Sequence, residues 1–111
     1  MMEQLIDSVQ NLVKEEYERA AAQYGWQHTS QHEAFAVILE EYQETCTEIE
    51  FVGNRIEEFW KNVCTDDVEQ NKQIAMQIHN VALLAACEAI QTAAMAYKAT
   101  KGYKKPEVDY E

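Results

Sequence analysis

The scarcity of residues that interrupt helices constrains this chain more than any other feature of its sequence. Its 111 residues include only three glycines and one proline, while Ala, Glu, Gln and other helix formers dominate. Strands would need turn residues at short intervals, and the chain offers few such places. A chain of this length suits one domain with a modest core. The sequence therefore predicts a single all-α domain, which we place at residues 1–102.

Local start and stop signals mark the first two helices. Apolar residues recur at helical spacing from Glu3 to Tyr24, and Gly25 supplies a stop. Ser30 and Glu33 then form a capping box. The second helix is expected to span 31–63, with an apolar stripe formed by Phe35, Ile38, Tyr42, Cys46, Ile49, Ile56, Trp60 and Val63.

The third helix is expected to follow a short turn at Thr65 and to continue to Thr100. Asp66 is predicted to be its N-cap, and Glu69 completes a second capping box. At 1.5 Å per residue such a helix reaches roughly 50 Å. Gly53 is the weakest point of the preceding helix, because glycine costs about 1 kcal/mol relative to alanine. The segment 103–111, which contains the proline, is expected to be a mobile tail.

The chain is strongly acidic, with a formal net charge of −11. Its nine basic residues are scattered apart from a few lysines near the C-terminus, which argues against duplex nucleic acid as a partner. An acidic protein would bind a phosphate-bearing small molecule through a divalent cation that bridges carboxylate and phosphate. The charge balance is therefore a first indication of a metal site.

Cysteine usage indicates a reducing compartment. Cys46, Cys64 and Cys87 are odd in number and lack metal-ligand spacing, and the N-terminus shows no signal-peptide pattern. We expect a cytoplasmic protein in which the three thiols occupy small apolar positions in the core or at its boundary.

The segment from Val81 to Tyr97 is apolar almost all round, with Glu88 near its centre. It falls short of a membrane-spanning length and holds a carboxylate, so no membrane partner is expected. A helix that is apolar on all sides must be buried by other helices on all sides. Three helices of a small chain can hardly provide that cover, which predicts a homo-oligomer, a dimer or a tetramer, that completes a larger bundle.

Helix geometry brings several carboxylates together. If the second and third helices are antiparallel about the turn, facing positions have numbers that add to about 132. Glu41 then faces Gln91, and Glu44 faces Glu88. The glutamates of the second helix can also be read as an ordinary acidic exterior. A carboxylate at Glu88 must be protonated, paired with a base or bound to a metal, and gathered carboxylates favour Mg²⁺ or Mn²⁺.

The motif residues resemble those of the MazG-like all-α nucleoside triphosphate pyrophosphohydrolases. That family carries E-E-x-x-E on one helix and E-x-x-D on the next. Here Glu40, Glu41 and Glu44 match the first element, Glu88 opens the second, and Gln91 replaces its aspartate. The resemblance covers roughly residues 24 to 97, with the stretch from about Phe51 to Ile78 lengthening both helices.

The resemblance implies Mg²⁺-dependent hydrolysis of a nucleoside triphosphate to the monophosphate and pyrophosphate. If the family's residue roles apply here, the metal ligands are Glu41, Glu44 and Glu88, and Gln91 is a weaker ligand through its amide oxygen. The catalytic residues are then Glu40 and Glu41. The alternative is a non-catalytic helical-bundle interaction protein of the same ancestry, with a phage as one source, in which Gln91 marks a decayed site.

Two further residues are candidates for contacting the nucleotide substrate. Lys98 shares a stripe with Glu88 and Gln91 and can reach a phosphate, although a lysine near a helix end often only complements the helix dipole. Trp26 can stack on a base or simply anchor its loop. The histidines His28, His32 and His79 lack ligand spacing and are expected to be bystanders.

Overall fold

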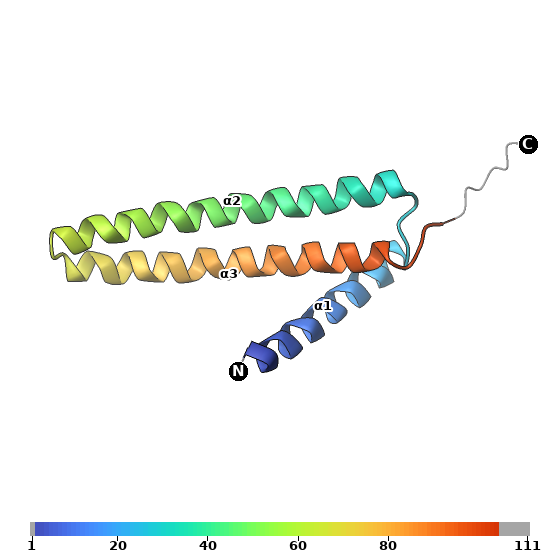
Figure 1. Ribbon diagram of the computed structural model, residues 1–111, viewed down its shortest axis with the longest axis horizontal. Coiled ribbons are helices and arrows are strands. Elements are labelled where there is room, and N and C mark those ends of the chain that lie inside the picture. Colours follow the sequence, from blue (N-terminus) through green and yellow to red (C-terminus); the bar gives the residue numbers. More distant parts are fainter. Residues whose placement is uncertain (1, 105–111) are drawn as a thin grey trace, which may run out of the picture. The chain divides into compact units, whose positions relative to one another are not determined.

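Three long helices make up the fold in a computed structural model that describes residues 2–104 (Figure 1). They are α1 (Met2–Tyr24), α2 (Gln31–Cys64) and α3 (Val68–Ala99). The described residues contain no strand, and one isolated bridge joins His28 to Tyr103. The prediction of an all-α protein is confirmed, and each predicted helix end lies within a residue or two of the observed one.

The start of α2 and the end of α1 follow the predicted local chemistry. Gly25 adopts a φ of 100°, and its amide donates to Ala21 O at 2.8 Å, which closes α1. The Glu33 amide donates to Ser30 Oγ at 3.1 Å, and Glu33 Oε1 accepts from the Thr29 amide at 2.7 Å. The first bond is the one predicted for the capping box, whereas the Glu33 carboxylate accepts from the residue before Ser30 instead of from Ser30 itself.

The start of α3 differs by one residue from the prediction. Asp67 is the N-cap, because its Oδ1 accepts from the Gln70 amide at 3.1 Å. Asp66 lies in the turn with a φ of 59°, a left-handed conformation that aspartate tolerates better than most residues. Two consecutive aspartates offer two possible caps, and only the turn's backbone geometry selects between them.

Residues 42–89 form one compact unit, a helical hairpin of α2 and α3 (Figure 1). Arg55 Nη1 donates to Gln77 Oε1 at 3.1 Å, and Asn62 Nδ2 donates to Asn71 Oδ1 at 3.0 Å. The numbers of the bonded residues add to 132 and 133, so the helices are antiparallel in the predicted register. Helix α2 continues without a break through Gly53.

The inner face of this hairpin unit is unusually polar. On both helices the residues withdrawn from solvent repeat at alternating steps of three and four. On α2 they are Thr45, Glu48, Val52, Arg55, Phe59 and Asn62, and on α3 they are Asn71, Ile74, Ile78, Val81, Ala85 and Glu88. The apolar stripe of α2 points elsewhere and is exposed. All three cysteines are also exposed. The expectation that their thiols lie in the core or at its boundary is therefore wrong.

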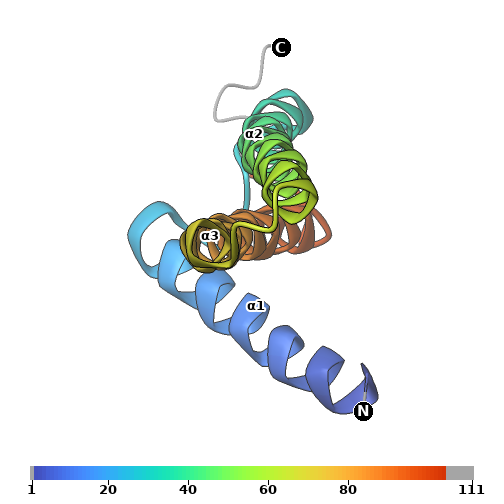
Figure 2. The same cartoon turned by 90° about the vertical axis from the view of Figure 1, so that its left-hand side faces the viewer.

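The second compact unit contains α1, the first part of α2 and the last part of α3 (residues 2–41 and 90–104). Its core is formed by Tyr17, Ala21 and Ala94, with Val13 and Met95 packed against it. The Tyr17 ring makes edge-on contacts with Trp26 and Tyr97, at centroid distances of 5.6 and 5.1 Å. The C-terminal half of α1 therefore packs on the end of α3 (Figure 2).

The C-terminal segment begins in an ordered contact. The Lys104 amide donates to His28 O at 3.1 Å, and Gly102, with a φ of 83°, ends the preceding turn. The remainder of the predicted mobile tail, residues 105–111, lies outside the described residues.

Helix α3 is long and apolar enough to cross a membrane when judged by length and composition alone. It is the one helix among the described residues that passes this test, and 11 % of its most apolar window is buried.

Candidate functional site

Three carboxylates gather on facing turns of α2 and α3. One oxygen each of Glu41, Glu44 and Glu88 lie within 4.8 Å of one another. Glu44 and Glu88 face each other across the hairpin, as the register requires, and Glu41 precedes Glu44 by one turn of the same helix. The three glutamates that the sequence assigns to a metal therefore come together.

The carboxylates of this cluster differ in exposure. Glu44 is exposed, whereas Glu41 and Glu88 are half-buried, and Glu41 Oε1 and Glu88 Oε2 are shielded from solvent. Carboxylate oxygens that lose contact with water need compensating charge or hydrogen bonds. Glu50 is exposed on α2, as expected for an ordinary acidic exterior, whereas Glu41 is half-buried.

A cavity of about 470 Å³ opens in the α1 unit beside Glu41. This volume lies in the range that small-molecule sites occupy. Its polar lining on α2 and α3 includes Glu40, Glu41, Gln91 and Lys98, and α1 contributes Glu16, Arg19 and Tyr24. Four of the residues that the sequence singles out therefore line one cavity.

Lys98 is the most deeply placed cation of this cavity, at 5 % exposure. It follows Gln91 by seven residues, two turns along α3, so both residues lie on one face of the helix. The cavity lining also contains the carboxylates of Glu33, Glu40 and Glu41, and an ammonium group in this lining can pair with an anionic ligand. Its position is thus compatible with the predicted contact to a phosphate.

Arg19 brings a second cation to the cavity, already paired with Glu16. Its Nε donates to Glu16 Oε1 at 3.0 Å, and the guanidinium also contacts Glu16 Oε2. This bonding lowers the pKa of Glu16 below its ordinary value and raises that of Arg19. The pair keeps a guanidinium in the cavity lining.

Trp26 does not line this cavity. Its side chain is 58 % exposed and packs edge-on against Tyr17, and its carbonyl oxygen accepts from Tyr17 Oη at 3.0 Å. This placement matches the loop-anchoring alternative. Tyr24 of α1, in contrast, lies on the cavity wall.

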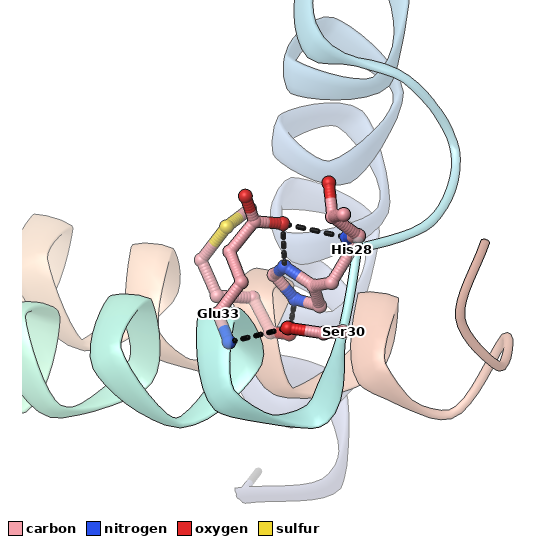
Figure 3. Close-up of polar contacts among 5 residues, drawn as sticks. His28, Ser30 and Glu33 are labelled. Carbon is pink, nitrogen blue, oxygen red and sulfur yellow. Dashed lines mark hydrogen bonds and ion pairs between the residues drawn. The ribbon is translucent and has the colours of Figure 1, made fainter. Parts of the chain in front are cut away.

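The loop between α1 and α2 is fixed by His28, whose side chain is 2 % exposed (Figure 3). His28 Nε2 lies 3.1 Å from Met95 O on α3, and Nδ1 lies 3.8 Å from Glu33 Oε1. The Thr29 amide bond holds the pKa of Glu33 below its ordinary value, and His28 adds to this effect. His28 therefore connects the loop to α2 and α3 and forms part of the cavity wall, so the expectation that it has no role is wrong.

Sequence reasoning missed the contribution of α1. Glu16 and Tyr24 are eight residues apart and share a face with Ala20, a spacing visible in the sequence. Nothing in the sequence indicates on which side of α3 this helix packs, so the cavity wall was not predicted.

Comparison of the chain with protein-family models, with curated proteins and with solved structures finds no match. The likeness to the MazG-like enzymes therefore depends on the motif residues of the sequence.

Proposed function

We propose that the protein is a Mg²⁺-dependent pyrophosphohydrolase that converts a nucleoside or deoxynucleoside triphosphate to its monophosphate and pyrophosphate. The observation that carries this proposal is the convergence of Glu41, Glu44 and Glu88 at the edge of a cavity lined by Lys98. Carboxylates to hold a metal and cations to hold phosphate are the two requirements of metal-assisted phosphoryl chemistry.

The donor set fits Mg²⁺. Oxygen ligands at about 2.1 Å from one octahedral ion lie about 3.0 Å apart when adjacent and about 4.2 Å apart when opposite, so side chains whose oxygens lie within 4.8 Å must rotate to close the remaining distance. All three donors are carboxylate oxygens, the type that Mg²⁺ and Mn²⁺ prefer. The bound ion would neutralise phosphate charge and lower the pKa of a water molecule.

The remaining side chains have complementary roles in this proposal. Glu40 lines the cavity next to Glu41 and can accept a proton from the attacking water. Gln91 offers a neutral amide oxygen to the metal or the substrate. Lys98 and Arg19 stabilise the charge of the phosphates, and Tyr24 presents a ring to the base.

The test is a screen of the eight common ribo- and deoxyribonucleoside triphosphates for pyrophosphate release, with and without Mg²⁺. We expect release from at least one of them, dependent on the metal. Glu88→Gln keeps size and hydrogen bonding but removes a charge, so it should lower turnover at least 100-fold with an unchanged circular dichroism spectrum. Glu50→Gln, an exposed position on α2, is the matched control and should retain full activity.

A non-catalytic bundle of the same ancestry is the second candidate, and Gln91 is the observation that favours it. The family resemblance calls for an aspartate at this position, and the amide lowers the negative charge available to a metal. Under this alternative no triphosphate is hydrolysed, and Mg²⁺ does not raise the melting temperature.

A further inference from the structure

The chain that follows α3 turns back toward the loop between α1 and α2 (Figure 1). Gly102 makes this reversal possible, because its φ of 83° is a conformation that residues with a side chain rarely adopt. Residues 101–104 then lie beside residues 25–29, and hydrogen bonds join the two segments. We call residues 101–104 the latch.

Two hydrogen bonds hold the latch on the loop. The Lys104 amide donates to His28 O at 3.1 Å, and Gln27 Nε2 donates to Lys101 O at 2.8 Å. The first of these bonds belongs to the isolated bridge between His28 and Tyr103. On the latch both bonds use main-chain atoms, so the exposed side chains of Lys101 and Lys104 are not needed for them.

The loop that the latch contacts is also a wall of the cavity. Gln27, His28 and Thr29 line the cavity together with Lys98 of α3. Gln27 and His28 therefore have two contacts each, because both belong to the cavity lining and both bond to the latch. A change in the position of the latch thus acts directly on the cavity wall.

Lys98 connects the latch to the cavity along the chain. It lies in the last turn of α3, and the Lys101 amide donates to Lys98 O at 3.0 Å. The last turn of a helix frays readily, because its final carbonyls have no partner within the helix. Here the loop holds this end of α3 at two points: His28 Nε2 lies 3.1 Å from Met95 O, and Gln27 bonds to Lys101 O.

We propose that the latch regulates the cavity. When the latch is closed, Lys98 and the loop are held in the form that binds an anionic ligand. When it opens, the last turn of α3 frays, Lys98 leaves the cavity and binding weakens. The identity of the ligand rests on the proposed function, whereas the control of Lys98 by the latch does not. Because few hydrogen bonds hold the latch, its opening is a local event that leaves the helices otherwise folded.

Latch closure and ligand binding are linked in this proposal. If only the closed form binds, the apparent dissociation constant of the ligand rises as the closed fraction falls. By the same linkage, a bound ligand increases the closed fraction and keeps Lys98 in the cavity.

Lys104→Pro opens the latch, because proline removes the amide proton that His28 O accepts. Lys104→Ala is the matched control, since it removes the side chain and keeps the amide. Gly102→Ala is a second opening variant, because a side chain disfavours the positive φ of the reversal. All three substitutions lie outside the helices, so the circular dichroism spectrum should stay close to that of wild type.

The first measurement needs no ligand. Brief acetylation of the full chain, followed by mass spectrometry, reports how often Lys98, which is 5 % exposed, reaches solvent. Labelling of Lys98 should be at least fivefold faster in Lys104→Pro and Gly102→Ala than in wild type, and unchanged in Lys104→Ala. The exposed Lys72 of the hairpin unit is the internal reference and should react equally in all four proteins.

The second measurement adds Mg²⁺ and pyrophosphate, a product of the proposed reaction. In wild type they should slow the labelling of Lys98 at least threefold. The pyrophosphate concentration needed for half of this protection should be at least fivefold higher in Lys104→Pro, because a smaller fraction of the chains is closed.

The outcomes separate the latch from the proposed function. Equal labelling of Lys98 in wild type and in both opening variants would overturn the latch, whatever pyrophosphate does. Protection at the same pyrophosphate concentration in wild type and Lys104→Pro would overturn its control of binding. Faster labelling in the opening variants, with no protection by Mg²⁺ and pyrophosphate in any protein, would support the control of Lys98 by the latch and count against the proposed function.

Discussion

Glu88 illustrates how much of the candidate site depends on the environment of single residues. It lies half-buried in the most apolar part of the chain, facing Glu44 and close to Glu41. Negative charges at this separation raise the free energy of one another unless a cation is shared. Under the proposed function a divalent ion would relieve this repulsion, and the neighbouring residues would determine how tightly it binds.

Gln91→Asp tests one of those neighbours. The substitution adds a negative charge one turn from Glu88, so Mg²⁺ should bind at least threefold more tightly in the absence of nucleotide. Calorimetric titration of both proteins with Mg²⁺ provides the measurement. An unchanged affinity together with a lower melting temperature would indicate that Gln91 only bonds between helices.

Lys98→Met tests the other side of the cavity. The thioether keeps the buried aliphatic stem but removes the ammonium, so the KM for the triphosphate should rise at least tenfold while Mg²⁺ affinity stays unchanged. Steady-state kinetics and metal titration separate these effects. Lys101→Met, an exposed lysine one turn later, is the control.

At the level of helices, the sequence was sufficient to predict those features that depend on residues close together in the chain. Gly25, the Ser30–Glu33 capping box and the turn after Cys64 fixed the helix ends and the register of the hairpin to within one or two residues. The sequence did not show which face of α2 packs on α3, because that packing depends on residues far apart in the chain. The α2 stripe that packs on α3 contains Glu48, Arg55 and Asn62, while the more apolar stripe beside it stays exposed. Apolarity alone would have selected the wrong face.

The N-terminus of α2 should depend on pH through Glu33. Its pKa is lowered in the folded protein by the Thr29 amide, so the bond contributes stability at pH values above the unfolded pKa of about 4.3. This contribution is lost as pH falls through the lowered folded value. The stability difference between wild type and Glu33→Gln should therefore shrink below about pH 4.3, as urea titrations across pH 2.5 to 7 can show. A constant difference would assign the effect to packing.

For the whole molecule, the polar inner face of the hairpin and the exposed apolar stripe of α2 lead us to expect that folding is coupled to association. A protein that unfolds as a dimer melts at a temperature that depends on its concentration. A tenfold dilution should lower the melting temperature by about 3–5 °C. Scanning calorimetry from 2 to 200 µM measures this dependence, and a concentration-independent transition would mean that each chain folds alone.

The seven-residue repeat of the hairpin has a consequence for how the chain tolerates insertions and deletions. Removing residues 53–59 together with 73–79 takes one repeat from each arm, so every remaining side chain keeps its direction. Loss of a single residue from one arm would rotate all that follows by about 100° and bring the exposed stripe inward. Relatives of this chain should therefore vary in hairpin length by paired multiples of seven, with the carboxylate cluster left in place.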